Sequence, residues 1–172
     1  HGAQTAKMMV DIEQIVQKEN PKGIVVYGDT NSTLAGALVA AKLNIPVFHI
    51  EAGLRSFNKE MPEEINRVLT DHISELLFVP SHLALNNLRN EGIINNVFNV
   101  GDIMKDLIHY IQKNKLIKDN IINGNYYYAT IHRPYNTDDK GRLLNVLTAL
   151  NNLGKKVIMA IHPRTSNLMY DY

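Results

Sequence analysis

The sequence predicts an α/β protein built from two Rossmann-like parallel-sheet units, each of them incomplete. Short apolar runs alternate with segments of helical character along almost the whole chain, beginning with the β-branched run at 24–27. Apolar strands joined by helices are typical of parallel sheets that helices cover on both faces. A polar stretch rich in asparagine and lysine at 113–124 interrupts the alternation. We therefore expect residues 1–112 to form the C-terminal part of a first unit, 113–124 a linker and 125–172 the start of a second unit.

Apolar periodicity and capping residues predict the individual elements. Apolar residues recur at helical spacing over 4–18, and 31–43 is rich in small residues, with Asn31 or Ser32 as its N-cap. Pro62 opens another helix at a first-turn position, where proline is tolerated. Further helices are expected at 81–92, 102–113 and 137–153, and strands at 24–27, 46–50, 76–79, 97–100, 126–131 and 157–161.

Composition excludes several classes of function. The 172 residues are 45% hydrophobic and 20% charged with a net charge of +1, which gives no reason to expect a nucleic-acid or membrane partner. Cysteine is absent, which excludes disulfides and thiolate metal sites, and no His and Glu spacing indicates a metal site. No apolar run approaches the roughly 20 residues that span a bilayer, and the N-terminal segment lacks the features of a signal peptide. We expect a cytoplasmic protein.

The two ends of the chain suggest that it is a piece of a longer protein. It begins at His1 inside a helix-like pattern and stops at Tyr172 just after a strand signal. We therefore expect further residues on both sides, and a binding site that is only partly contained in this chain.

Polar side chains recur at the carboxyl ends of the predicted strands, where open parallel sheets bind their ligands. Each has an ordinary explanation when taken alone: Asp29 can cap the next helix, His49 can be a core histidine and His162 can be a solvated loop residue. Recurrence after nearly every strand favours a shared site instead. The residues concerned are Asp29, His49, Glu51, Ser81, His132, Arg133, His162 and Arg164.

The helix that begins at Pro62 carries a second signal. Glu63, Arg67 and Asp71 lie at spacings of four, opposite an apolar face that begins at Ile65. This pattern fits an exposed ladder of ion pairs. It also fits a helix face that lines a cleft, where Arg67 holds Glu63 and contacts a substrate phosphate or sugar.

Two motifs resemble those of a known enzyme family. Residues 49–55 read H-I-E-A-G-L-R and residues 62–67 read P-E-E-I-N-R, while Gly28-Asp29-Thr30 and His132-Arg133 stand at the expected places. The chain resembles the non-hydrolysing UDP-N-acetylglucosamine 2-epimerases, which have a GT-B-type fold of two Rossmann-like domains. The resemblance runs from Gln4 to about Arg164.

The resemblance implies that UDP-N-acetylglucosamine and UDP-N-acetylmannosamine are interconverted without a cofactor, by a protein that is a homodimer when full length. UDP leaves carbon 1 as carbon 2 loses its proton, giving 2-acetamidoglucal, and UDP then adds back. Inversion at carbon 2 requires acid–base groups on both faces of the sugar, and carboxylates stabilise the positive charge that develops at carbon 1. By resemblance, the candidate catalytic residues are Asp29, Glu51, Glu63, Arg67 and His132, and the candidate substrate contacts are Gln4, His49, Arg55, Arg133 and His162.

The sequence departs from the family pattern at a few positions and leaves other functions open. Pro134 and Tyr135 replace an arginine and a glutamate that often follow His-Arg, and Thr5 replaces a histidine that often follows Gln4. The alternatives are a hydrolysing 2-epimerase that releases UDP and free N-acetylmannosamine, a GT-B glycosyltransferase, and a fragment that binds a sugar nucleotide without turnover.

Overall fold

The chain divides into two compact units, His1–Leu116 and Ile117–Tyr172. Each unit has a parallel sheet of its own. Half of the expected linker at 113–124, namely 117–121 and 123, lies outside the described residues. The computed structural model describes residues 2–116, 122 and 124–169.

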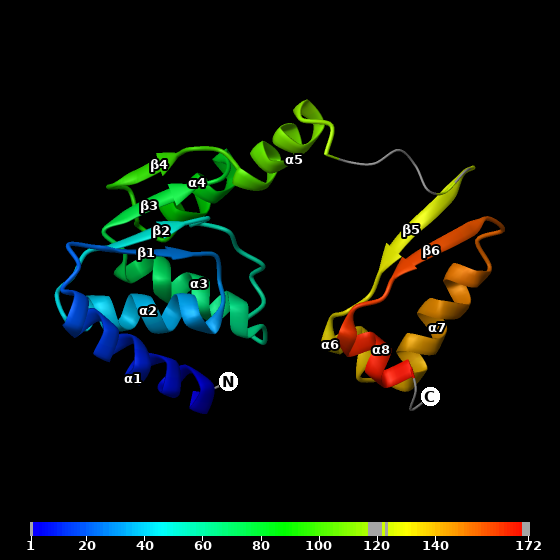
Figure 1. Ribbon diagram of the computed structural model, residues 1–172, viewed down its shortest axis with the longest axis horizontal. Helices are drawn as coiled ribbons and strands as arrows, with labels where there is room; N and C mark the ends of the chain where they lie inside the picture. The colour runs from blue at the N-terminus through cyan, green and yellow to red at the C-terminus, as the bar shows by residue number, and fades with distance from the viewer. Residues whose placement is uncertain (1, 117–121, 123, 170–172) are drawn as a thin grey trace. The chain divides into compact units, whose positions relative to one another are not determined.

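The described part of the first unit is built around a four-stranded parallel sheet (Figure 1). Neighbouring strands follow the chain order and run in parallel, so their carboxyl ends all lie at the same edge of the sheet. The strands are β1 (Ile24–Tyr27), β2 (Val47–Ile50), β3 (Leu76–Val79) and β4 (Val97–Asn99), and the helices are α1 (Gly2–Glu19), α2 (Asn31–Lys42), α3 (Pro62–Ile73), α4 (His82–Asn90) and α5 (Ile103–Lys113).

Helices cover one face of this sheet, not both faces as the sequence predicted. Buried Val26, Val47 and Leu77 lie on the face where α2, α3 and α4 pack. Figure 1 shows α2 and α3 on the same side of the sheet, and α1 packs against α2. The opposite face carries apolar side chains that remain exposed, such as Val25 at 61% and Phe98 at 48%. For the described residues, the expectation of cover on both faces is wrong.

Small residues bring α2 close to the sheet. Ala37 and Ala40 are fully buried against Val26 and Val47, and a Cβ added to Gly36 would lie 3.5 Å from the Val26 side chain. The turn that carries Asp29 joins the end of β1 to the start of this helix.

The N-cap of α2 differs from the prediction. Thr30, rather than Asn31 or Ser32, accepts a hydrogen bond through its hydroxyl from the backbone N–H of Thr33. Threonine, asparagine and serine all cap helices, so a run of such residues does not show from sequence which one adopts the extended backbone of a cap.

The second unit contains a parallel pair of strands, β5 (Tyr126–Thr130) and β6 (Lys156–Ala160), joined through helices. The expected helix over 137–153 is confirmed as α7 (Lys140–Asn151), and a short helix that was not predicted, α6 (Pro134–Thr137), precedes it. Asp139 interrupts them, because its side chain caps α7 by accepting from the Arg142 N–H. A last helix, α8 (Pro163–Met169), follows β6 and was not predicted.

Within the described part of the chain, every helix is too short or too polar to cross a membrane.

Candidate active site

The carboxyl ends of β1 and β2 bring two predicted site residues to one edge of the sheet. Tyr27 and Ile50 are register partners, and the turns that follow them carry Asp29 and Glu51. The Gly28 N–H donates to the Ile50 carbonyl at 3.0 Å, which ties the first turn to the neighbouring strand. Asp29 and Glu51 are therefore positioned by the sheet itself.

Glu51 has a backbone conformation that is unusual for a residue with a side chain. Its φ is 73°, in the left-handed region. The backbone N–H groups of Glu51 and Ala52 both donate to the Phe78 carbonyl, each at 3.1 Å, and these bonds hold the turn. Such conformations persist where the surrounding structure imposes them, and they are concentrated at active sites.

The surroundings of Glu51 raise the pKa of its carboxyl. Burial has the largest effect, and the negative charges of Asp29 and Asp102 act in the same direction. The positive charges of Arg67 and His49 oppose this rise without cancelling it. A carboxyl with a raised pKa exchanges its proton closer to neutral pH, which suits a general acid or base.

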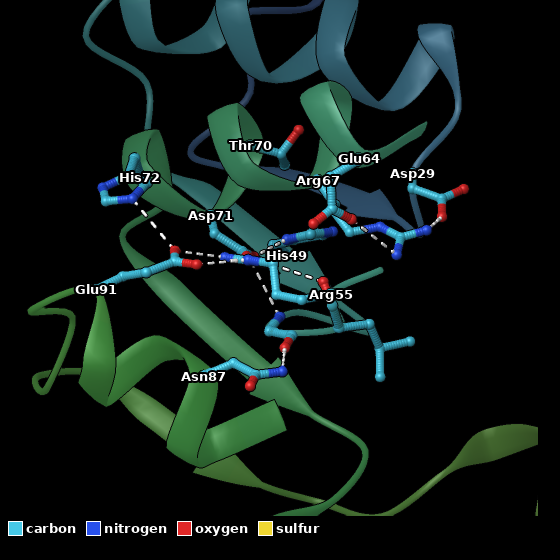
Figure 2. Close-up of polar contacts among 12 residues, drawn as sticks. Asp29, His49, Arg55, Glu64, Arg67, Thr70, Asp71, His72, Asn87 and Glu91 are labelled. Atoms are coloured by element: carbon cyan, nitrogen blue, oxygen red, sulfur yellow. Dashed lines mark hydrogen bonds and ion pairs between the residues drawn. The ribbon is translucent and has the colours of Figure 1, made fainter. Parts of the chain in front are cut away.

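Arg67 of α3 bridges two carboxylates (Figure 2). One terminal nitrogen forms an ion pair with Asp29, and the other lies 3.3 Å from Glu64 Oε2. Glu64 is 4% exposed and accepts hydrogen bonds from the backbone N–H groups of Ser56 and Phe57, each at 2.8 Å. Burial raises the pKa of Glu64, but these hydrogen bonds and the charge of Arg67 outweigh it, so the pKa lies below its ordinary value.

Among the described residues, Arg67 Nε is the one buried side-chain nitrogen or oxygen that lacks a hydrogen-bond partner. A buried, unpaired N–H is unfavourable, so it marks a place where a bound oxygen atom would be stabilised. We call Asp29, Glu51, Glu64 and Arg67 the carboxylate end of the first unit.

The predicted ion-pair ladder on α3 is wrong. Glu63 is half-buried and forms no hydrogen bond or ion pair with any described residue, so Arg67 does not hold it. The next residue, Glu64, forms the ion pair with Arg67 instead. Asp71, the third member of the predicted ladder, is 1% exposed and bonded inside the unit.

The polar side of α3 faces inward, contrary to its hydrophobic pattern. Glu64, Asn66, Thr70 and Asp71 are its buried residues. The apolar residues of the opposite side remain in part at the surface, with Ile65 and Leu69 exposed by 48% and 45%. Glu64, Asn66 and Asp71 bond to residues outside the helix, which helical periodicity does not reveal. The Thr70 hydroxyl donates to the Asn66 carbonyl within it.

His49 and Arg55, predicted as substrate contacts, lie inside the first unit (Figure 2). His49 is fully buried, with Nδ1 2.6 Å from Asp71 Oδ1 and Nε2 2.8 Å from the Gly28 carbonyl oxygen. Arg55 Nη1 donates to Asp71 Oδ2 at 2.7 Å, and Arg55 Nε and Nη2 donate to the two oxygens of Glu91, each at 2.7 Å. The structure thus corrects the prediction, because both side chains support the site from within the unit.

A cavity of about 330 Å³ opens beside Glu51 on the uncovered face of the sheet. Tyr27 and Phe78 contribute apolar walls, and Asp102 and Asp106 contribute carboxylates from the start of α5. Sequence reasoning missed Asp102, although the rule that singled out the other strand ends applies equally to β4. No group of three metal-ligating side chains occurs among the described residues.

Gln4 is connected to the carboxylate end through two asparagines. Its side-chain oxygen accepts a hydrogen bond from Asn31 at 3.0 Å. Asn66 Nδ2 then donates to Asn31 Oδ1 at 3.1 Å and to the Asp29 carbonyl at 2.9 Å. The exposed Gln4 therefore lies at the outer end of a hydrogen-bonded chain that begins at Asp29.

The second unit presents its predicted site residues at the surface. Thr130 and Ala160 are register partners, so His132 and Arg133 leave the same sheet edge as His162. The two histidine rings lie 5.3 Å apart between centroids, and all three side chains are exposed. We call His132, Arg133 and His162 the histidine end of the second unit.

Comparison with known proteins identifies the family. A family model described as UDP-N-acetylglucosamine 2-epimerase matches residues 1–172. The chain belongs to this family. The match includes the carboxylate end and the histidine end alike.

Two curated relatives of similar identity to this chain are named for different UDP-sugars. A UDP-N-acetylglucosamine 2-epimerase homolog from Methanococcus maripaludis is 51% identical over 100% of this chain and 50% of its own length. The UDP-2,3-diacetamido-2,3-dideoxy-D-glucuronate 2-epimerase of Pseudomonas aeruginosa is 46% identical over 98% of this chain and 50% of its own length. The chain thus spans about half the length of these relatives.

A solved member of the epimerase family has the same fold. The UDP-GlcNAc 2-epimerase of Methanocaldococcus jannaschii, crystallised in complex with UDP-GlcNAc and UDP, matches with a TM-score of 0.89 and 45% identity. The match covers 99% of this chain and 50% of that one. The predicted α/β, GT-B-like fold class is therefore confirmed, and the chain contains about half of that fold.

Proposed function

We propose that this chain supplies the acid–base residues of an enzyme that inverts carbon 2 of UDP-N-acetylglucosamine to give UDP-N-acetylmannosamine. Membership of the epimerase family supports this proposal. The observation that carries it is Glu51, a carboxyl with a raised pKa next to the Asp29–Arg67 ion pair at the strand ends. Because the relatives are about twice as long, activity is to be measured on a protein of their length that contains residues 1–172, called below the full-length protein.

The proposed reaction begins with loss of UDP. The bond between carbon 1 and the phosphate oxygen breaks, and its electron pair leaves with UDP. Positive charge then develops at carbon 1, which an ionised carboxylate stabilises. Asp29 suits this role, because its side chain is held at the sheet edge by the ion pair with Arg67. Arg67 Nε is buried and lacks a hydrogen-bond partner among the described residues, and we assign a substrate oxygen to it.

Proton transfer at carbon 2 completes the elimination. A base removes the proton, the electron pair forms the double bond of 2-acetamidoglucal, and a second group delivers a proton to the opposite face as UDP adds back. Glu51 suits one of these roles because its pKa is raised. Glu63 is the candidate for the other, since no described residue engages its carboxylate. His132 either neutralises the departing UDP or relays a proton.

Isotope exchange tests the proposal. The full-length protein is incubated with UDP-N-acetylglucosamine in deuterated water, and the products are examined by mass spectrometry and proton NMR. We expect one deuterium at carbon 2 of both UDP-sugars. Free N-acetylmannosamine accumulating with UDP would indicate the hydrolysing reaction, and a folded protein that neither exchanges nor turns over this substrate would contradict the proposal.

A diacetamido sugar is the second candidate substrate. The Pseudomonas aeruginosa relative is named for UDP-2,3-diacetamido-2,3-dideoxy-D-glucuronate, and its identity to this chain is 46%. Both substrates carry an acetamido group and an invertible proton at carbon 2, so the same acid–base residues serve either. The ratio of kcat/KM for the two UDP-sugars decides between them, because the true substrate is the one with the higher value.

Assembly and location belong to the same proposal. The resemblance implies a homodimer and the composition a cytoplasmic location. Light scattering on the full-length protein measures the first, since a mass of two chains supports it and a mass of one chain contradicts it.

A further inference from the structure

His49 lies at the centre of a buried polar cluster behind the carboxylate end (Figure 2). The side chains of His49 and Asp71 are both 0% exposed. Arg55 joins the cluster with a side chain that is 1% exposed, and it links Asp71 to Glu91. Because buried charges are unfavourable unless they are paired, the protonation states in this cluster are constrained by its hydrogen bonds.

Both ring nitrogens of His49 face atoms that accept hydrogen bonds. Nδ1 lies 2.6 Å from a carboxylate oxygen of Asp71, and Nε2 lies 2.8 Å from the carbonyl oxygen of Gly28. A neutral imidazole carries a single N–H, so one ring nitrogen would direct its lone pair at an oxygen lone pair. With a proton on each nitrogen, both contacts become hydrogen bonds.

Asp71 is poorly placed to carry a proton itself. Its Oδ2 accepts from the Gly53 N–H at 3.0 Å and from Arg55 Nη1 at 2.7 Å, while its Oδ1 faces His49. Arg55 also pairs with Glu91, so one buried guanidinium serves two carboxylates, and Glu91 lies 3.3 Å from Nε2 of the exposed His72 as well. A proton on His49 places a second positive charge directly against Asp71.

We infer that His49 is doubly protonated and is a positioning residue, which holds the turn that carries Asp29 and places a positive charge next to Glu51. The Gly28 carbonyl that it binds immediately precedes Asp29, and His49 lies two residues before Glu51 in the chain. The consequence for catalysis rests on the proposed function, whereas the protonation state does not.

The variant Asp71→Asn separates the charge of His49 from its geometry. Gly53 and Arg55 both donate to one oxygen of Asp71, so an asparagine keeps its oxygen at that place and turns its NH₂ group toward His49. His49 then accepts at Nδ1 and keeps its Nε2–H for Gly28. The hydrogen bonds are retained, but the imidazole is neutral.

Nitrogen NMR of the histidine rings measures the protonation state directly in the full-length protein. At about pH 8, an ordinary histidine with a pKa of about 6.5 is mostly neutral. We expect both His49 nitrogens to have chemical shifts of protonated nitrogens, and one of them to move to the unprotonated range in Asp71→Asn. His49→Gln assigns the signals, and His82, exposed at the start of α4, is the reference. An unprotonated His49 nitrogen in the unmodified protein would overturn the inference.

The pH dependence of kcat/KM measures the effect on catalysis. The charged groups that act on Glu51 are Asp29, Asp102, Arg67 and His49. Asp71→Asn removes the positive charge of His49 and leaves that of Arg67. The part of the kcat/KM profile that follows Glu51 ionisation should then move to higher pH, by about one unit.

A matched control removes an aspartate charge elsewhere. Asp11→Asn, on the exposed side of α1, leaves this part of the profile unmoved. Thermal unfolding checks that Asp71→Asn is folded. If the folded variant and the unmodified protein had the same pH profile of kcat/KM, the positioning role of His49 would be overturned. Absence of turnover in the unmodified protein would instead contradict the proposed function, and the NMR result would still decide the protonation state.

Discussion

The carboxylate end and the histidine end both follow parallel strands, yet they are built differently. At the carboxylate end, Glu64 is buried and its carboxylate is bonded to Ser56, Phe57 and Arg67. At the histidine end, the His132 side chain is exposed, as are those of Arg133 and His162. The first arrangement is stabilised by folding of the unit, whereas the second is displayed to solvent.

This difference shows that a position after a strand does not determine what a polar residue does. His49 belongs to the first unit and His132 to the second, and each lies near the carboxyl end of a strand. His49 points into the helix-covered side and bonds to Asp71, while His132 lies outside next to the His162 ring. Substitutions at the two ends should therefore separate effects on turnover from effects on stability.

The largest effect is expected from Glu51→Gln in the full-length protein. Loss of a general acid or base reduces turnover by about 100- to 10,000-fold. The glutamine retains the size of the side chain, so the affinity for UDP should be unchanged. Steady-state kinetics and calorimetry with UDP measure the two quantities. Turnover within threefold of the unmodified enzyme, which is roughly 0.6 kcal/mol in the barrier, would remove Glu51 from the mechanism.

The next effect is that of Glu63→Gln, which should lose most turnover, about 100-fold, with the melting temperature unchanged. Glu63 forms no bond with a described residue, so its replacement removes no interaction that stabilises the first unit. Thermal unfolding and a coupled assay for epimerisation measure the two quantities. A variant with near-normal turnover would show that the second acid–base group is elsewhere.

Its neighbour provides the contrast, because Glu64→Gln should lower stability by about 2 kcal/mol. The buried carboxylate of Glu64 accepts from two backbone N–H groups, and a glutamine presents an NH₂ group to one of its present donors. Denaturant unfolding of the residue 1–172 chain and of the full-length protein measures the loss. Equal midpoints for Glu64→Gln and Glu63→Gln would contradict the contrast.

The pH dependence of stability sharpens this contrast. The folded-state pKa of Glu64 lies below its ordinary value of 4.5, so its ionised form stabilises the folded protein above about that pH. This stabilisation is lost as the pH falls through the lower folded-state value. We therefore expect Glu64→Gln to lose less stability on acidification than the unmodified chain. Parallel acid-unfolding curves for the two proteins would show that Glu64 does not contribute in this way.

Much of the fold could be predicted from sequence, since continuous apolar strands and capped helices depend on neighbouring residues. The orientation of α3 could not, because its inward residues have distant partners. Asp71 bonds to Gly53 and Arg55, and Glu64 to Ser56, so the polar side is stabilised by loops that helical periodicity does not take into account. Hydrophobic pattern alone assigns the apolar side to the core.

The candidate site was predicted in part for the same reason. The motifs indicated Asp29, Glu51 and Arg67, which the structure brings to one sheet edge or into direct contact. They did not distinguish Glu63 from Glu64, because adjacent residues of a helix differ by about 100° in direction and the loop that binds Glu64 is not visible in the helix sequence.

The exposed histidine end should contribute little to stability. His132→Asn should change the free energy of unfolding by less than about 0.5 kcal/mol, because the side chain is exposed and its substitution leaves the buried Leu143 and Thr165 in place. The same variant should lower turnover if His132 assists the departure of UDP. Denaturant unfolding and kinetics on one preparation compare the two. The matched control is His82→Asn, an exposed histidine outside both ends, which should change neither. A large loss of stability in His132→Asn would show that the histidine end is held by folding as firmly as the carboxylate end, and the distinction between the two ends would fail.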